Sequence, residues 1–290
     1  MINRLCIIGV GLIGGSLARA LKRAGACAEV VGCGRDEAAL RRAVELGVID
    51  RYHSDPALAV SGTDVVVLAV PLGMMEPVLR RIAPALSAGA VITDVGSAKG
   101  SVVAAAQAVF GTVPARFVPG HPIAGTEKSG VEASFAELFQ GRRVILTPLS
   151  GTDAEAHRIV RRMWEQTGAE VVDMAVEHHD EVLAATSHLP HLLALALVDT
   201  LARMQETAEI FRYAAGGFRD FTRIASSDPK MWRDICLANR EAVVAMLDRF
   251  SDDLAGLRDA IDAEDGEAIA EVFTRAKTAR DRFCRQERVE

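Results

Sequence analysis

The sequence lacks the features that would place it in a membrane, outside the cell or on a nucleic acid. In its 290 residues no apolar run approaches the ~20 residues of a membrane span. The first residues lead directly into an apolar strand pattern, without the charged, apolar and small-residue regions of a secretory signal. A net charge of −6 argues against nucleic acids and anionic membranes as partners. These absences predict a cytoplasmic protein.

Cysteine is scarce and its pattern is not that of a disulfide framework. The five cysteines, Cys6, Cys27, Cys33, Cys236 and Cys284, are odd in number and scattered. Because Cys6 and Cys33 lie in or beside expected core strands, reduced thiols are the simplest interpretation. The chain shows no internal repeat and no low-complexity tract, and its length suffices for two domains with separate cores.

What the sequence does contain is a glycine-rich turn at its start. An apolar run ends in Gly9, Gly11 and Gly14, spaced Gly-x-Gly-x-x-Gly, and continues into a helical pattern. Strand, tight turn and helix N-terminus are the context of a dinucleotide fingerprint. We expect Gly9 to make the turn, Gly11 to let the backbone approach a pyrophosphate, and Gly14 to let the helix pack closely. A glycine-rich turn without a ligand is the alternative.

The end of the second expected strand, residues 29–32, bears on the choice of cofactor. NAD-preferring sites usually carry an acid there, which binds the ribose 2′-hydroxyl. This chain has Gly34 and Arg35, and a guanidinium can pair bidentately with a 2′-phosphate. Alternatively Arg35 is a solvated loop residue and Asp36, the expected N-cap of helix 36–46, takes the ribose. We favour NADP over NAD.

Short apolar runs alternate with helical patterns through the first 174 residues, which is typical of βαβ units and a mostly parallel sheet. Strands are expected at 64–71, 91–94, 117–120, 144–147 and 170–173, the last two completing the sheet, and helices at 75–87, 101–110 and 153–168. From residue 175 the period stays helical, with a long apolar helix at 192–204 that we expect to pack with its neighbours against a second subunit. The predicted fold is an α/β Rossmann-type dinucleotide-binding domain, residues 1–174, followed by an all-α dimerisation domain, residues 175–290.

Polar side chains follow the expected strands at the carboxyl edge of the sheet, where ligands bind in such folds. Lys99 stands in the first turn of a helix, where a cation is unfavourable unless it meets an anion. Ser97 is either the N-cap of that helix or a donor to a substrate. The loop after the 117–120 strand carries His121 and Glu127. Beside a nucleotide site His121 is the expected proton acceptor, and a surface histidine is the alternative.

Two polar clusters stand out in the helical half. His188 and His191 open the long apolar helix, and without a third ligand they are as well explained by caps and core histidines as by a metal site. Asp220 and Arg223 share one helical face, either as a weak ion pair or with Asp220 orienting the guanidinium to bind a carboxylate. Trp232 can wall the same cavity.

Six motifs, in order along the chain, resemble the prephenate/arogenate dehydrogenase family of tyrosine biosynthesis. They are residues 9–16, 69–71, 94–100, 121–127, 187–191 and 217–223. The resemblance implies oxidative decarboxylation of prephenate to 4-hydroxyphenylpyruvate, or of arogenate to tyrosine, with NAD or NADP as hydride acceptor. It also implies a homodimer formed through the C-terminal helices.

The resemblance also implies roles for single residues. His121 corresponds to the catalytic histidine that deprotonates the ring hydroxyl, Ser97 to the residue that orients this hydroxyl and His121, and Arg223 to a carboxylate-binding arginine. The predicted substrate contacts are Arg223, His188, His191, Glu127, Lys99, Trp232 and Asp220. The predicted cofactor contacts are Gly9, Gly11, Leu12, Ile13, Gly14, Gly34, Arg35, Val70 and Pro71. No metal is expected. The departure at Gly34, where NAD-using relatives carry an acid, bears on cofactor preference rather than on activity.

Two other functions stay open at this point. Another dehydrogenase or reductase with a Rossmann and a helical domain, of the β-hydroxyacid or imine type, would share the architecture but would not need the loop at His121 or the 187–191 motif. A module that senses NADP without turnover would not need a base, an orienting serine and a carboxylate-binding arginine.

Overall fold

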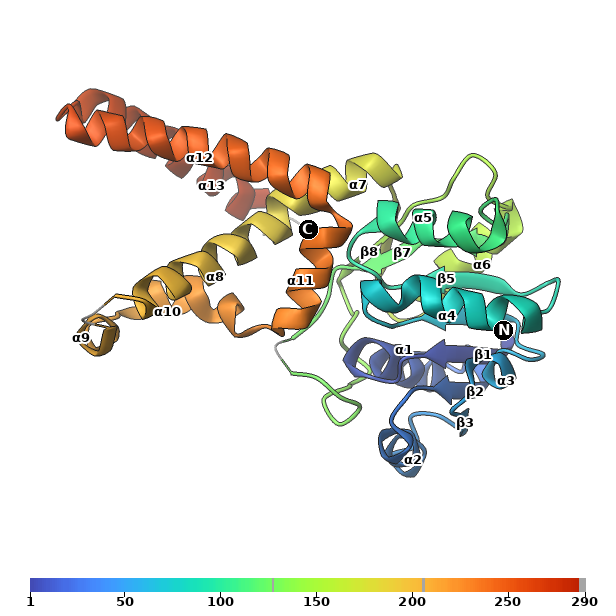
Figure 1. Cartoon of the computed structure of the whole chain (residues 1–290). Helices are drawn as coiled ribbons and strands as arrows, with labels where there is room; N and C mark the ends of the chain where they lie inside the picture. The colour runs from blue at the N-terminus through green and yellow to red at the C-terminus, as the bar shows by residue number, and fades with distance from the viewer. Residues whose placement is uncertain (127, 205–206, 287–290) are drawn as a thin grey trace. The chain divides into compact units, whose positions relative to one another are not determined.

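The computed structural model describes residues 1–126, 128–204 and 207–286 (Figure 1). The chain divides into two compact units, Met1–Arg240 and Glu241–Glu290, which are described separately. The larger unit therefore includes helices that follow residue 174, and the domain boundary expected at 174/175 stays a prediction.

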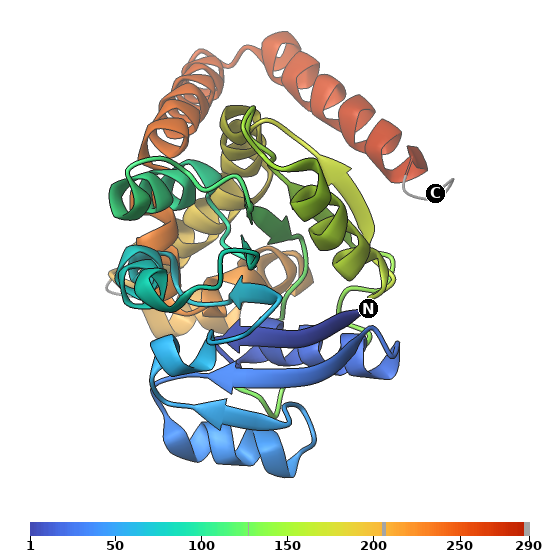
Figure 2. The same ribbon diagram turned by 90° about the vertical axis from the view of Figure 1, so that its right-hand side faces the viewer.

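A six-stranded parallel sheet forms the centre of the larger unit, and Figure 2 shows its first strands in blue. Its order is β3-β2-β1-β4-β5-β6, with β1 at Ile2–Ile8, β2 at Cys27–Cys33, β3 at Arg51–His53, β4 at Val65–Leu68, β5 at Val91–Asp94 and β6 at Phe117–Val118. The strand order reverses at β1, which lies between β2 and β4. In open α/β sheets a ligand binds at the carboxyl ends of the strands beside such a reversal.

Three more strands form a second sheet in the order β7-β8-β9, namely Gly120–Pro122, Arg143–Leu146 and Glu170–Asp173. The prediction that the last two strands complete the first sheet is therefore wrong. The expected strand 117–120 divides at Pro119, whose carbonyl accepts the N–H of Thr147 at 2.9 Å. As a result His121, predicted in a loop, lies in β7 and pairs with Ile145.

The helices around the sheets begin and end at readable signals. They are α1 (Leu12–Arg23), α2 (Glu37–Glu45), α3 (Pro56–Ala59), the 3₁₀ turn η1 (Leu72–Met74), α4 (Met75–Ile82), the 3₁₀ turn η2 (Ala83–Ala85), α5 (Lys99–Phe110) and α6 (Ala154–Glu165). Asp36 caps α2 as predicted, because its Oδ1 accepts the N–H groups of Ala38 and Ala39 at 2.9 and 3.1 Å. The helix expected at 75–87 ends at Ile82, just before Pro84.

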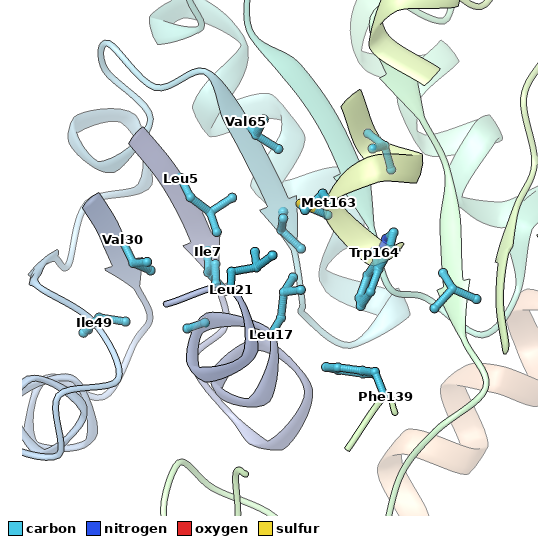
Figure 3. Packing of buried hydrophobic residues seen from close by; sticks show 14 of the residues in the cluster. Leu5, Ile7, Leu17, Leu21, Val30, Ile49, Val65, Phe139, Met163 and Trp164 are labelled. Carbon is cyan, nitrogen blue, oxygen red and sulfur yellow. The ribbon is translucent and has the colours of Figure 1, made fainter. Parts of the chain in front are cut away.

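The hydrophobic core holds the strands whose carboxyl ends carry the motifs. Figure 3 shows Leu5 and Ile7 of β1 beside Leu17 and Leu21 of α1, and all four are fully buried. Trp164 of α6 is also fully buried in this cluster. Burial of each such side chain contributes about 1.5–3 kcal/mol to folding. The packing therefore fixes α1 and its N-terminal turn against β1.

After β9 the described residues form helices and no further strand, as the periodicity predicts. In the larger unit these are α7 (Val176–Leu183), the π-helical turn η3 (Ala184–His188), α8 (Leu189–Ala202), α9 (Thr207–Arg212), α10 (Gly216–Thr222), the 3₁₀ turn η4 (Arg223–Ser226) and α11 (Pro229–Ala238). The second unit consists of α12 (Arg240–Asp262), from its second residue, and α13 (Gly266–Gln286). Its large apolar side chains Val244, Leu254, Ile261, Phe273 and Phe283 are all about half exposed.

One helical run, Val176–Ala202, is 27 residues long and apolar enough to cross a membrane by length and composition alone. The expectation that no apolar run approaches the length of a membrane span is therefore wrong. The run is weak support for a span, because core helices of other proteins pass the same test. It also carries His179, Asp180 and His188 in hydrogen bonds to other segments of the protein, and such groups are costly in lipid.

Candidate active site

The turn between β1 and α1 has the geometry of a phosphate-binding turn. Gly9 has a φ of 103°, and a Cβ there would lie 2.1 Å from the carbonyl oxygen of Ala69. A Cβ on Gly14 would lie 2.1 Å from the carbonyl oxygen of Gly9, so α1 packs directly on the turn. At Gly11 the described chain places no atom within 4 Å of a Cβ position, which leaves room for a ligand. Because α1 has no side-chain cap, its first N–H groups are available to a phosphate.

A cavity of about 510 Å³ opens at this turn. Its lining consists of Gly9, Val10, Gly11, Gly34, Arg35, Asp36, Ala39 and Leu40. The cavity joins the carboxyl ends of β1 and β2, where the fold places a dinucleotide. A second cavity of about 730 Å³ lies around the first residues of β1 and β4. That position is the opposite edge of the sheet, away from every motif.

The other predicted cofactor residues also lie at the carboxyl edge. Leu12 and Ile13 begin α1 and are partly buried. Val70 and Pro71 follow β4, and a Cβ at Gly9 would lie 3.4 Å from Cγ1 of Val70. The residues that would hold a dinucleotide are thus brought together by β1, β2 and β4.

His121 ends a chain of hydrogen bonds that starts at a carboxylate. Oδ1 of Asp180 lies 2.8 Å from Nδ1 of His179, and Nε2 of His179 lies 2.9 Å from Nδ1 of His121. A carboxylate only accepts, so Nδ1 of His179 carries its proton and its Nε2 accepts one. His121 must therefore be protonated on Nδ1. Its Nε2 keeps a lone pair, which is the state that a general base requires.

The surroundings keep this histidine pair neutral. His121 is 9% exposed. Burial lowers its pKa well below the ordinary value, and the nearby His179, Lys99 and His188 lower it further. Burial also lowers the pKa of His179 against the opposing effect of Asp180. Burial would raise the pKa of Asp180, but its hydrogen bonds hold that pKa below the ordinary value. At neutral pH the chain is a carboxylate followed by two neutral imidazoles.

Lys99 and Asp94 hold the backbone next to His121. Both side chains are fully buried, and Nζ of Lys99 donates to Oδ2 of Asp94 at 2.5 Å and to the carbonyl of Gly120 at 2.6 Å. Oδ1 of Asp94 accepts the N–H of Gly120 at 3.1 Å. Lys99 does meet an anion, but inside the protein. Because its ammonium has no exposed surface, the structure favours a positioning role for Lys99 over the predicted direct contact with substrate, which stays a prediction.

The N-terminus of α5 is capped from α7, and the two helices lie side by side (Figure 1). Oδ1 and Oδ2 of Asp180 accept the N–H groups of Lys99 and Gly100, each at 2.8 Å. The N-cap position is Ala98, so the alternative of Ser97 as the cap is wrong. Ser97 is partly buried, and its hydroxyl has no hydrogen bond to any described residue. That hydroxyl is free to contact a ligand.

Asn239 determines the tautomer of His188. Nδ2 of Asn239 lies 2.8 Å from the backbone oxygen of Asp180 and 3.2 Å from Nδ1 of His188. Because a carbonyl only accepts, this amide group is the donor in both contacts, and His188 carries its proton on Nε2. That Nε2 is buried and has no protein partner within the described ranges. Burial lowers the pKa of His188 to about 4, so the group is a neutral donor.

His191, Trp232 and Arg223 come together beside this donor. The rings of His191 and Trp232 stack with centroids 3.9 Å apart. Nδ1 of His191 lies 2.8 Å from the carbonyl oxygen of Ser187, so its Nε2 keeps a lone pair. The indole N–H of Trp232 is buried without a partner among the residues that the structure describes. Burial lowers the pKa of His191, and the charge of the exposed Arg223 lowers it further.

A π-helical turn, η3, places the two histidines. Pro190 stands in the first turn of α8 and has no N–H, so the carbonyl of Thr186 loses its α-helical partner. The wider turn at 184–188 accommodates this loss. π-Helical turns are frequent at functional sites, and here the turn carries His188 and precedes His191.

The structure does not bring together every predicted residue. Asp220 is exposed in α10, which ends at Thr222, and Arg223 begins the next turn. Within the described residues the two form no ion pair, so the predicted pairing, with Asp220 orienting the guanidinium, is wrong, whereas the binding of a carboxylate by Arg223 stays a prediction. Glu127 lies outside the described residues. No group of three or more His, Cys, Asp or Glu side chains in the described ranges is placed to hold a metal.

Four residues that organise the site were not predicted from the sequence: Asp94, His179, Asp180 and Asn239. Asp94 stands in a recognised motif at the end of β5, so its position was a usable signal. His179 and Asp180 were a weaker signal, as polar residues at the start of an otherwise apolar helical half. Asn239 carries no local signal, because its role depends on the approach of α11 to α7.

Comparison with known proteins identifies the family. Residues 17–173 match the family model for the nucleotide-binding domain of prephenate dehydrogenase, and residues 175–275 match that for its dimerization domain. The chain belongs to the prephenate dehydrogenase family. The predicted fold class, family and oxidoreductase class are confirmed.

The similarity to known proteins extends over nearly the whole chain. The cyclohexadienyl dehydrogenase of Zymomonas mobilis is 42% identical over 281 residues, 96% of this chain and 95% of that protein. The prephenate dehydrogenase of Bacillus subtilis is 37% identical over 285 residues, 97% and 76% of the respective lengths. The crystal structure of prephenate dehydrogenase from A. aeolicus, in complex with hydroxyphenyl propionate and NAD⁺, has a TM-score of 0.91 and 40% identity, covering 98% of this chain and 99% of that one.

Proposed function

We propose that this member of the prephenate dehydrogenase family converts prephenate to 4-hydroxyphenylpyruvate, or arogenate to tyrosine, by oxidative decarboxylation in tyrosine biosynthesis. The observation that carries the proposal is the lone pair on Nε2 of His121, held free by the hydrogen bond on Nδ1. Support also comes from the dinucleotide-binding turn at Gly9–Gly14 on the same edge of the sheet, and from relatives named cyclohexadienyl dehydrogenase and prephenate dehydrogenase.

The residues supply what the reaction needs. Ser97 orients the ring hydroxyl, and its proton moves to Nε2 of His121. At the same time the carbon that bears this hydroxyl loses its hydrogen as a hydride. A nicotinamide cofactor, when bound, supplies the hydride acceptor. Loss of CO₂ then breaks the bond from ring to carboxylate, and its electron pair completes the aromatic ring. His121 returns the proton to the ring oxygen, so the base is regenerated.

The substrate groups meet a complementary set of donors. Arg223 offers a charged guanidinium for a carboxylate, and Nε2 of His188 and the indole N–H of Trp232 are unpaired donors among the described residues. His191 stacks on Trp232, and we assign both rings to the wall of the substrate site. A dicarboxylate presents acceptors at both ends, which suits this set. Ligand binding removes the cost of leaving two buried N–H groups without partners.

We propose that the cofactor is NADP in preference to NAD. Arg35 lines the cavity, is exposed, and has no ion-pair partner in the described part of the chain. Oδ1 of Asp36 is occupied by the cap of α2. Replacing Arg35 by alanine is expected to raise the KM for NADP roughly 10- to 100-fold, the size of one charge-assisted hydrogen bond, and to leave the KM for NAD nearly unchanged. Equal changes for the two cofactors would contradict the preference.

We further propose a cytoplasmic homodimer formed through the helical part. Only 28% of the apolar window in Val176–Ala202 is buried within the chain, which leaves an apolar face for a second copy. The family model that covers this run is named for dimerization. Light scattering on the protein eluted from a size-exclusion column is expected to give twice the mass of one chain. A monomer at micromolar concentration would contradict this.

The activity is tested by following reduced cofactor in a two-by-two experiment. Prephenate and arogenate are each mixed with NAD and with NADP, and the near-ultraviolet absorbance of the reduced nicotinamide is recorded. Product is expected from at least one pair, fastest with NADP. Failure of all four combinations would overturn the proposed function.

A further inference from the structure

We infer that Asp180 and His179 are positioning residues that hold His121 in the tautomer with its proton on Nδ1 and its lone pair on Nε2. The inference deepens the proposed function and takes its catalytic meaning from it. It stands on the geometry of α7, which presents both residues to His121 of β7 and to the N-terminus of α5.

Every hydrogen bond described at the carboxylate of Asp180 is donated by an N–H group. Oδ1 accepts from the N–H of Lys99 and from Nδ1 of His179, and Oδ2 accepts from the N–H of Gly100, each at 2.8 Å. The positive end of the α5 dipole favours the ionised form. Reversing the chain would put the proton of His179 on Nε2, so that the lone pair on its Nδ1 would face Oδ1 of Asp180 with no proton between the two acceptors. The hydrogen bonds between Asp180, His179 and His121 can therefore be donated in one direction only, from His121 towards Asp180.

Burial makes this direction persistent. The side chain of His179 is fully buried and that of Asp180 is 13% exposed, so water does not substitute for either contact. The charged or titratable groups facing His121 are His179 from α7, His188 from η3 and Lys99 from α5. None of these neighbours is an anion. Asp180, acting through His179, stabilises the imidazolium that forms when His121 takes the substrate proton.

Asparagine at position 180 separates this role from a plain helix cap. Its NH₂ group must face either the N–H of Gly100 or the pair formed by the N–H of Lys99 and Nδ1 of His179. Facing the pair, it turns His179 to the opposite tautomer, and His121 then carries its proton on Nε2. Facing Gly100, it keeps the tautomer, but in both orientations the negative charge that stabilises the imidazolium is lost. A comparable Asp→Asn change in the serine-protease triad lowers kcat about 10⁴-fold for this reason.

The kinetic test compares Asp180→Asn with Glu181→Gln, a change at the next residue, whose carboxylate is 73% exposed. Asp180→Asn is expected to lower kcat about 10²- to 10⁴-fold with little change in KM. Its rate is also expected to keep rising with pH, because hydroxide replaces the lost base. Glu181→Gln is expected to match the parent. A parent-like kcat for Asp180→Asn, or a lowered kcat with the parent's pH profile, would overturn the inference.

A spectroscopic test does not depend on turnover, and its decisive reading is made on the parent protein. In the ¹⁵N-histidine-labelled parent protein, long-range ¹⁵N–¹H correlations report which nitrogen of each neutral imidazole is protonated, and His121→Asn identifies the His121 signals. We expect protonation on Nδ1 in the parent, and on Nε2 in the fraction of Asp180→Asn whose amide NH₂ group faces His179. Protonation on Nε2 in the parent would overturn the inference and leave the proposed reaction standing. If Nδ1 is protonated in the parent but no turnover is found, the proposed reaction is overturned and the tautomer assignment stands.

Discussion

Replacing Lys99 by methionine tests whether this residue positions the site or binds the substrate. The change removes the ammonium and keeps a side chain of similar length. It leaves the carboxylate of Asp94 buried without its cation and the carbonyl of Gly120 without its donor. Both losses fall inside the protein, next to the base.

The structure sets the size of the effect. Removing one partner of a buried ion pair destabilises a protein by about 3–5 kcal/mol. Asp94 retains two hydrogen bonds, from the N–H groups of Gly96 at 2.7 Å and Gly120 at 3.1 Å. We therefore expect the lower end, about 3 kcal/mol, out of a total stability of about 5–15 kcal/mol. The pair is buried on both sides, so no discount for solvent screening applies.

Urea unfolding followed by circular dichroism measures this loss. Lys22→Met is the matched control, because Lys22 pairs with Asp50 at 2.7 Å on the surface, and about 0–1 kcal/mol is expected there. Combining Lys99→Met with Asp94→Asn should recover part of the loss, since no charge is then left buried.

Kinetics on the same variants decide between the two roles of Lys99. A positioning role predicts a lowered kcat with an unchanged substrate KM, because Gly120 no longer fixes the neighbouring His121. A variant as stable as the parent, with a raised KM and an unchanged kcat, would refute this reasoning and restore direct substrate binding.

Three further predictions concern the histidines and the exposed arginine. His121→Asn should lower kcat by about 10²- to 10⁴-fold with little change in substrate KM, and turnover near the parent's would show that the base is another group. Arg223→Ala should chiefly raise the substrate KM in the same assay, whereas a pure kcat effect would speak against carboxylate binding. Burial lowers the pKa of His188 from 6.5 to about 4, so the folded protein binds fewer protons than the unfolded chain between these values. Stability should therefore fall as pH drops through this window, by about 3 kcal/mol for this group, and His188→Gln should flatten the dependence of urea midpoints on pH.

Local signals in the sequence predicted the elements that depend on neighbouring residues. The apolar runs of β4 and β5 read as buried parallel strands, and the cap of α2 at Asp36 followed from residue type alone. The glycines of the first turn were also readable, because each answers a local demand for space or a positive φ.

Partners far apart in the chain were beyond such signals. The pattern of apolar residues in a strand does not determine which sheet the strand joins, so β8 and β9 were assigned to the wrong sheet. The charge of Lys99 indicated that an anion was needed, but not that Asp94 would meet it in a fully buried pair. The link between Asp180 and the N-terminus of α5 spans about 80 residues and exists only once α7 packs on α5.

The direction of hydrogen bonding at the site follows from one residue acting through two different groups. The side-chain carboxylate of Asp180 fixes the tautomer of His179 and, through it, that of His121. Its backbone carbonyl fixes the orientation of the Asn239 amide and, through it, the tautomer of His188. The first path yields an acceptor at Nε2 and the second a donor. Of the two histidines, Asp180→Asn should therefore affect only His121 and leave His188 protonated on Nε2, because the backbone carbonyl is unchanged. A reversal of both histidines in the same ¹⁵N spectra would mean that the substitution displaces α7 as a whole.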